Sequence, residues 1–356
     1  MKEPRKMTDG MHRPEDLPRG VVATRYWQEL EDGRLQCDLC PRHCGMREGQ
    51  TAFCFVRTRN GDQIVLTSYG RPSGFCVDPI EKKPLNHFLP GSSVFSFGAA
   101  GCNLACRFCQ NWDMSKSREF DTLTAWAGPE EIAAAAERYG CPSVAYTYND
   151  PVIFHEYAID TAKACHMRGI KSVAVSAGYV CPEPRAEFCS HMDAANIDLK
   201  AFSETFYWKF TDAHLEPALD TLRYVKHETS VWLEVTNLLI AGLNDSEKEI
   251  EEMSQWVVEN LGPDMPMHFT ALHPAWRMLG RPPTPPETVK QARRIALGNG
   301  VRYAYTGNIH DPERGSTYCN NCGQQLIERV GYSLGEWNLT ADGKCNACQT
   351  PCAGVF

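Results

Sequence analysis

Short apolar runs alternate with helical stretches over residues 94–306, and this alternation limits the fold more than any other feature of the chain. We predict strands at Val94–Ala100, Ser143–Tyr148, Lys171–Ser176, Ala194–Leu199, Val231–Leu239, Met267–Leu272 and Tyr303–Thr306. The helix after the first strand is clearly marked, because Pro129 opens it and Gly140 follows its end. Such β-α repetition predicts parallel strands joined by right-handed crossovers.

Six or seven such units fit within residues 94–310, whereas a complete (β/α)8 barrel needs about 250 residues. We therefore predict an α/β fold whose central domain, residues 94–310, is a partial (β/α)6-type TIM barrel. Residues 1–93 are expected to form a small cysteine-rich module with β structure around Ile64–Tyr69. Residues 311–356, where the spacing changes, are expected to form a zinc-ribbon-like tail.

Unusual polar sequences follow the predicted strands. Active sites of parallel α/β folds gather at the carboxyl ends of the strands. Those ends read GAAGCNLAC, YTYNDP, VSAGY, IDLK, LEVTN and HFTALHP. Because a purely structural barrel needs none of these residues, we expect a functional site at this edge of the sheet.

The chain contains 17 cysteines, and their odd total and short spacings favour metal ligation over disulfides. Its charged first 20 residues hold no apolar core of the kind a signal peptide needs, and no later stretch reaches about 18 apolar residues. We therefore expect a cytoplasmic protein, with reduced thiols and no membrane partner. The formal net charge of −8 argues against a broad nucleic-acid-binding surface.

Three spaced sets contain most of the cysteines: Cys37, Cys40, Cys44 and Cys54; Cys102, Cys106 and Cys109; and Cys319, Cys322, Cys345 and Cys348. The middle set, C-x3-C-x2-C, offers three thiolates, which can hold three corners of a cubane iron–sulfur cluster and leave the fourth iron open. An open iron can chelate the amino and carboxylate groups of S-adenosylmethionine (SAM). The alternatives are a fortuitous triplet and a zinc site completed by a distant ligand.

The middle set stands in GCNLACRFCQN, which resembles the C-x3-C-x-aromatic-C signature of the radical SAM superfamily, with Phe108 as the aromatic residue. The segments PIEKKPLNHFLPGSSVFSFG and NIDLKAF resemble the branch around pyruvate formate-lyase activating enzyme. More narrowly, the chain is similar to the radical SAM enzymes of the AmmeMemoRadiSam system, in which YTYN-acid-P replaces Gly-Gly-Glu. The resemblance extends from about Cys37 to Phe356.

The resemblance implies a [4Fe–4S] cluster on Cys102, Cys106 and Cys109, which are then the catalytic cysteines. It also implies SAM contacts from Phe108, Tyr148, Asn149, Asp150, Ser176, Asp198, Lys200 and His268. Asp150 can accept a hydrogen bond from the methionine ammonium group, and Lys200 can neutralise the methionine carboxylate. In the plain alternative, Ser176 and Asp150 cap a helix or a loop, and His268 and His273 are core histidines.

The first and third cysteine sets are also candidate metal sites. The four tail cysteines, Cys319, Cys322, Cys345 and Cys348, match the C-x2-C…C-x2-C spacing of zinc sites, and we predict structural zinc there. An auxiliary iron–sulfur cluster or a metal-free fold is the alternative, with Cys352 as a bystander. Cys37, Cys40, Cys44 and Cys54 suffice for zinc or for an auxiliary iron–sulfur cluster, and ligand count does not decide between these and no metal.

These observations predict a radical SAM oxidoreductase that cleaves SAM reductively and abstracts hydrogen from a protein or small-molecule substrate. The alternatives are a true activase of a glycyl-radical enzyme and a non-catalytic iron–sulfur electron carrier. The expected partners are a reducing electron donor such as flavodoxin or ferredoxin and the AmmeMemoRadiSam partner proteins. From Tyr318 to the end of the tail only Arg329 and Lys344 bring positive charge, so protein docking is expected there rather than nucleic-acid binding.

Overall fold

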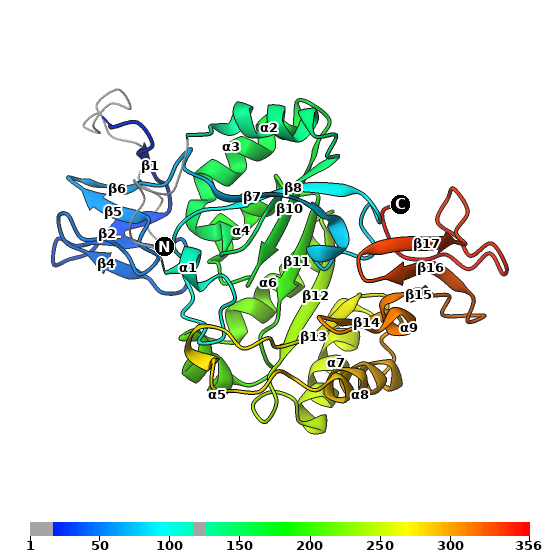
Figure 1. The fold of residues 1–356 in the computed structure, drawn as a ribbon. Coiled ribbons are helices and arrows are strands. Elements are labelled where there is room, and N and C mark those ends of the chain that lie inside the picture. Colours follow the sequence, from blue (N-terminus) through cyan, green and yellow to red (C-terminus); the bar gives the residue numbers. More distant parts are fainter. Residues whose placement is uncertain (1–16, 117–125) are drawn as a thin grey trace.

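The computed structural model describes residues 17–116 and 126–356 and shows a mixed α/β fold (Figure 1). Residues 1–16, part of the charged segment in which no signal-peptide core was expected, lie outside the described residues. The central sheet has eight strands, which run in sequence order from one edge to the other: β7 (Ser73–Pro79), β8 (Ser93–Gly98), β9 (Ser143–Tyr146), β10 (Lys171–Ser176), β11 (Ala194–Asp198), β12 (Trp232–Leu239), β13 (Met267–Ala271) and β14 (Ala304–Gly307).

Strands β8–β14 are parallel, and β7 pairs with β8 in the antiparallel direction. The seven predicted strands correspond to β8–β14, with ends that differ by at most two residues. This central parallel sheet confirms the predicted α/β class. Strands β9 and β13 are buried along their whole length, as expected for parallel strands covered on both faces.

Helices and single turns lie between the strands. They are α1 (Trp112–Ser115), α2 (Pro129–Arg138), α3 (His155–His166), α4 (Pro182–Cys189), α5 (Glu204–Phe206), α6 (Glu216–Glu228), α7 (Glu247–Leu261), α8 (Pro286–Gly298) and α9 (Pro312–Gly315), with single turns η2 (Ile80–Lys82), η3 (Pro151–Phe154), η4 (Tyr207–Thr211) and η5 (Trp276–Met278). Proline stands in the first turn of α2, α4, α6 and α8, where its missing N–H costs no hydrogen bond. Ser246 caps α7 by accepting a hydrogen bond from the Glu249 backbone N–H, at 3.2 Å.

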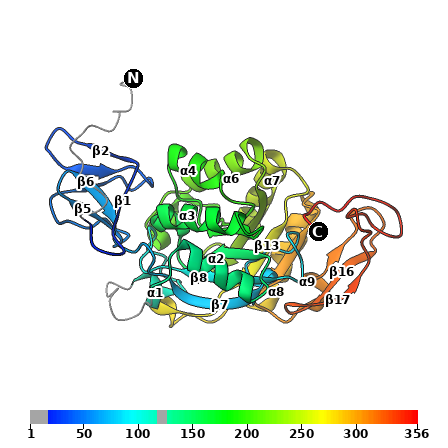
Figure 2. The same ribbon diagram turned by 90° about the horizontal axis from the view of Figure 1, so that it is seen from above.

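Small antiparallel sheets lie at opposite ends of the central sheet (Figures 1 and 2). The N-terminal ones contain β1 (Val22–Ala23), β5 (Arg57–Asn60) and β6 (Gln63–Leu66), and β2 (Trp27–Glu29), β3 (Leu35–Cys37) and β4 (Cys44–Met46). The tail sheet contains β15 (Thr317–Tyr318), β16 (Gln325–Val330) and β17 (Ser333–Trp337). A buried ion pair of 2.5 Å between Arg57 and Glu156 joins the N-terminal part to α3. Within the described residues, no helix is long and apolar enough to cross a membrane.

Candidate active site

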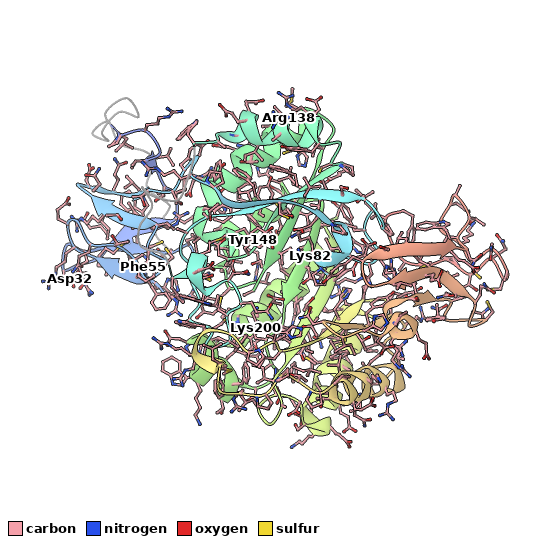
Figure 3. The ribbon with its side chains drawn as sticks, viewed as in Figure 1. Asp32, Phe55, Lys82, Arg138, Tyr148 and Lys200 are labelled. Atoms are coloured by element: carbon pink, nitrogen blue, oxygen red, sulfur yellow. The ribbon has the colours of Figure 1, made fainter. Side chains whose placement is uncertain are left out.

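A cavity of about 340 Å³ opens at the carboxyl ends of the parallel strands. Its walls include every residue predicted for the central cluster and for the cofactor: Cys102, Cys106, Phe108, Cys109, Tyr148, Asn149, Asp150, Ser176, Asp198, Lys200 and His268. Figure 3 shows Lys82, Tyr148 and Lys200, from three separate segments, over the middle of the sheet. The structure therefore gathers these side chains at the edge where the sequence places its polar residues.

The loop between β8 and α1 brings Cys102, Cys106 and Cys109 to the cavity. Gly101 has a φ of +90°, and a Cβ there would lie 2.0 Å from the Cys54 carbonyl oxygen, so only glycine fits. Burial raises the pKa of Cys102 to about 11 and that of Cys106 to about 12, although the Lys200 charge opposes the shift at Cys106. Both thiols therefore keep their protons at neutral pH until a metal displaces them.

The donor chemistry of this loop fits an iron–sulfur cluster, because three soft thiols line one wall. Their sulfurs are not drawn together as around a single ion. Within the described part of the chain, only the tail cysteines place three or more metal-binding atoms within 4.8 Å of one another. The wider spacing leaves room for a multi-atom group among the three thiols.

Asp150 and Ser176, predicted as separate cofactor contacts, bind each other. The Ser176 hydroxyl donates to one carboxylate oxygen of Asp150 at 3.0 Å, and the Val152 backbone N–H donates to the same oxygen at 3.1 Å. The Ala177 backbone N–H donates to the other oxygen at 3.0 Å. Asp150 thus caps η3, as the plain alternative expected, and still lines the cavity. Burial raises its pKa, and these hydrogen bonds and Lys200 oppose that rise.

Tyr148 and Asn149 shape the loop in front of Asp150. Tyr148 has a φ of +70°, in the left-handed region that non-glycine residues rarely adopt. The Asn149 amide donates to the carbonyl oxygens of Ala99 at 2.7 Å and Gly101 at 2.8 Å. Asn149 therefore ties this loop to the segment that leads into Cys102, and so supports the cysteine loop directly.

Lys200 provides a half-buried positive charge on the cavity wall. Its ammonium group donates to the Asp198 carboxylate, and its backbone N–H donates to the Tyr207 hydroxyl at 3.1 Å. Burial disfavours the charge, but the Asp198 carboxylate outweighs burial and raises the pKa of Lys200 above its ordinary value. Lys200 therefore stays protonated at any physiological pH.

Glu234 is a buried carboxylate that the sequence analysis did not select. It accepts hydrogen bonds from His268 Nε2 at 2.6 Å, from the backbone N–H groups of His87 and Asn86 at 2.7 and 3.0 Å, and from the Trp232 indole at 3.0 Å. Burial raises the pKa of Glu234, but the partners, His268 first, lower it overall. Because Nε2 of His268 donates to Glu234, the Nδ1 atom remains for other contacts. The signal for Glu234 was its place in LEVTN, a strand end already noted for its polar residues.

The tail also lines the cavity, through Arg329, Gly331 and Tyr332. The Arg329 guanidinium is buried and donates to Thr317 Oγ1 at 2.7 Å and to the Asn86 carbonyl oxygen at 2.6 Å. The sequence analysis did not select this wall, nor Glu81, Lys82, Asn86 and Tyr305, because their segments meet only in the folded chain. The cavity is therefore built from the β7–β8 segment, the parallel strands and the tail.

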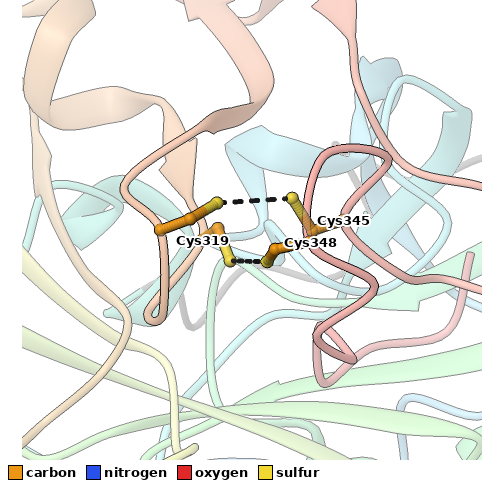
Figure 4. A group of neighbouring side chains, drawn as sticks. Cys319, Cys345 and Cys348 are labelled. Carbon is orange, nitrogen blue, oxygen red and sulfur yellow. Dashed lines mark hydrogen bonds between the residues drawn. The ribbon is translucent and has the colours of Figure 1, made fainter.

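The four tail cysteines form a compact group. Their sulfurs all lie within 4.8 Å of one another, with Cys319 3.5 Å from Cys348 and Cys322 3.7 Å from Cys345 (Figure 4). The four N-terminal cysteines, Cys37, Cys40, Cys44 and Cys54, line a second, small cavity. The structure thus brings together the members of each predicted set.

Comparison with known proteins identifies a family. The Radical SAM superfamily model matches residues 98–257. The uncharacterized protein MJ0808 of Methanocaldococcus jannaschii is 37% identical over 324 residues, which cover 91% of this chain and 96% of that protein. The 4-hydroxyphenylacetate decarboxylase activating enzyme of Clostridium scatologenes is 26% identical over 120 residues, 33% of this chain and 38% of that enzyme.

Among solved structures, a domain of pyruvate-formate lyase-activating enzyme from Bacteroides vulgatus is similar to this chain, with a TM-score of 0.41 and 23% identity. The match covers 46% of this chain and 98% of that domain.

Proposed function

The chain belongs to the radical SAM superfamily, in one family with the Methanocaldococcus jannaschii protein, and on that premise we propose that it is a radical SAM oxidoreductase whose substrate binds in the large cavity. A [4Fe–4S] cluster bound there would supply the electron that splits SAM into methionine and the 5′-deoxyadenosyl radical, which abstracts hydrogen from a protein or small-molecule substrate. One observation supports the proposal above all others. A single cavity gathers three thiols with a charged lysine and a ring of polar residues.

The cluster ligands in this proposal are Cys102, Cys106 and Cys109. Backbone contacts hold the loop in place, because the Ala105 N–H donates to the Thr211 carbonyl oxygen and the Arg107 N–H to that of Phe210, both at 2.8 Å. Lys116 donates to the Leu104 carbonyl oxygen, also at 2.8 Å. The loop is thus organised before any ligand binds, so binding of the cluster costs little conformational entropy.

The residues around the loop provide the complementary charges for SAM. Lys200 offers a permanent cation for the methionine carboxylate, and Asp150 a carboxylate for the ammonium group. Phe108 is buried, with its ring 5.8 Å from that of Phe206, and this apolar wall suits the adenine. His268, held by Glu234, stands on the β13 side, where the adenosyl group or the substrate would lie.

We interpret the central sheet as a partial (β/α)6-type barrel and the tail as a zinc-ribbon-like unit. Zinc holds four thiolates at Zn–S distances of about 2.3 Å, which places the sulfurs of a tetrahedron about 3.8 Å apart. The tail separations of 3.5 and 3.7 Å are close to this value. Zinc is therefore the metal we propose for Cys319, Cys322, Cys345 and Cys348.

The second candidate is an activase of a glycyl-radical enzyme, which the match to the Clostridium scatologenes activating enzyme favours. Such an activase would act on the backbone of a protein partner, whereas a small-molecule substrate would need no partner in the cavity. A glycyl-radical signal in a partner protein after incubation with SAM distinguishes the two.

The experiment is reductive cleavage of SAM by anaerobically reconstituted protein. With dithionite and SAM, we expect 5′-deoxyadenosine and methionine in equal amounts, measured by liquid chromatography and mass spectrometry. Cys106→Ala should abolish both products, because it removes one ligand of the cluster, whereas Cys165→Ala, a buried cysteine of α3 outside the three sets, should retain them. Iron-loaded protein that yields no 5′-deoxyadenosine contradicts the proposal.

A further inference from the structure

We propose that Cys37, Cys40, Cys44 and Cys54 hold a second iron–sulfur cluster, with four cysteine ligands, next to the loop that contains Cys102. The sequence leaves zinc, iron–sulfur and no metal open at this set. Three features of the structure favour the cluster: the shape of the cavity, the spacing of the sulfurs and the groups that surround them.

All four cysteines line one small cavity between the N-terminal strands and the central domain. Cys37 at the end of β3 and Cys44 at the start of β4 are paired residues of an antiparallel ladder, so their side chains share one face. Cys40 comes from the turn between these strands, and Cys54 from the loop before β5. The rest of the wall is half apolar, with Leu39, Ala52 and Ile153, and half polar, with Arg42, Arg57 and Asn103. The site is therefore a small cavity that four thiols share with two arginines.

The spacing of the sulfurs separates this set from the tail set. In the tail, two pairs of sulfurs are in contact and all four atoms lie within 4.8 Å of one another. Across the described residues no second group of three ligands is that compact, so the N-terminal sulfurs enclose a wider space. Zinc would need all of them about 3.8 Å apart. The set instead resembles that of Cys102, Cys106 and Cys109, which also surrounds an open space.

The surroundings stabilise thiolates in a buried place. The backbone N–H groups of Leu39, Arg42 and Val56 oppose the effect of burial on the pKa of Cys37, Cys40 and Cys54, respectively. The buried Arg57 guanidinium lies near Cys37 and Cys54 and favours their charged form. Burial nevertheless keeps the pKa of these thiols high, at about 12 for Cys37, so the free thiols are neutral. Hydrogen bonds to sulfur and a nearby cation are the groups that tune protein iron–sulfur clusters.

The proposed cluster contacts the loop that brings Cys102 to the large cavity. Asn103 lines the small cavity together with the four cysteines, and the Arg42 guanidinium donates to the Asn103 carbonyl oxygen. The Cys54 carbonyl oxygen lies against Gly101, where no side chain fits. Among the described residues that line the large cavity, none belongs to the N-terminal set. A cluster here would therefore support the loop of Cys102 or supply electrons to it. It would not touch a substrate in the large cavity.

The test is metal content of anaerobically reconstituted protein in which Cys102, Cys106 and Cys109 are all replaced by alanine. This variant leaves the N-terminal set intact, and we expect about four irons and four sulfides per chain. Wild-type protein should hold about eight irons with one zinc, and Cys165→Ala should match the wild type. Cys40→Ala with Cys54→Ala should lower the wild-type iron by half.

The outcomes separate this proposal from the proposed function. A triple variant with no iron, or with a second zinc, overturns the second cluster, whatever the activity of the wild type. A triple variant that keeps about four irons, as many as the wild type, supports the second cluster and instead contradicts the cluster on Cys102. An electron paramagnetic resonance signal from the reduced triple variant provides a readout that does not depend on SAM cleavage.

Discussion

At the scale of single residues, His87 is a buried histidine whose hydrogen bonds depend on its protonation state. Its Nδ1 donates to the Ala353 carbonyl oxygen at 2.6 Å, and its Nε2 accepts from the Tyr305 hydroxyl. Tyr305 in turn contacts Thr317, which accepts from Arg329. Every donor in this chain has an acceptor only while His87 is neutral. Burial, the first cause, lowers the pKa of His87 to about 4.

This pKa predicts how stability changes with pH. The unfolded chain binds a proton to His87 near pH 6.5, whereas the folded chain resists it down to about pH 4, so folding loses stability as pH falls through this window. The loss from this residue is about 3 kcal/mol when the window has been crossed. His87→Gln should be less stable at pH 7 and should lose less on acidification.

Urea unfolding of both proteins at pH 7, 6, 5 and 4.5 measures the effect. The exposed His273 provides the control, since His273→Gln makes the same substitution without touching the hydrogen bonds of His87. Parallel slopes for His87→Gln and wild type would show that His87 is not the buried neutral histidine described above.

At the scale of elements, the β16–β17 hairpin links the four tail cysteines to the cavity at the carboxyl ends of the parallel strands. Arg329 and Tyr332 of this hairpin line the cavity, while the cysteines before and after it form the compact group. The two cysteine pairs could be predicted from their spacing. The contact of the hairpin with Asn86 could not, because it joins residues far apart in sequence through a backbone carbonyl, which no local pattern reveals.

We expect Cys322→Ala to remove one metal ion per chain and to loosen the tail. Cys322 is exposed, so the substitution removes a ligand and leaves no hole in a core. The tail owes its fold to the metal in this account, and protease should therefore cut within residues 316–356 of the variant while the central domain stays intact. Mass spectrometry of the fragments and metal analysis provide the readout.

Cys352→Ala is the matched control for that experiment, because Cys352 is a buried tail cysteine outside the compact group. It should keep both the metal and the protection from protease. Equal metal content and equal protection in Cys322→Ala and wild type would contradict the role given to the tail cysteines.

At the scale of the whole molecule, the parallel core was predictable and its edges were not. Strands β8–β14 are mostly buried and rich in apolar residues, a pattern that the sequence reveals directly. Strand β7 was missed because it is an edge strand that contains Gly74 and Pro79 and exposes Phe75 and Val77. In the site, the residues that the family resemblance implies were predicted correctly as cavity-lining residues. Glu234, whose hydrogen-bond partners come from three segments of the chain, was not predicted.

The central claim is that three cysteines leave one iron open for SAM. Electron–nuclear double resonance on the reduced Cys40→Ala and Cys54→Ala double variant, which retains only the Cys102 site, measures this most directly. With SAM labelled with ¹⁵N at the methionine amino group, we predict a ¹⁵N coupling to the cluster that disappears with unlabelled SAM. A fully loaded cluster without any such coupling would contradict the account.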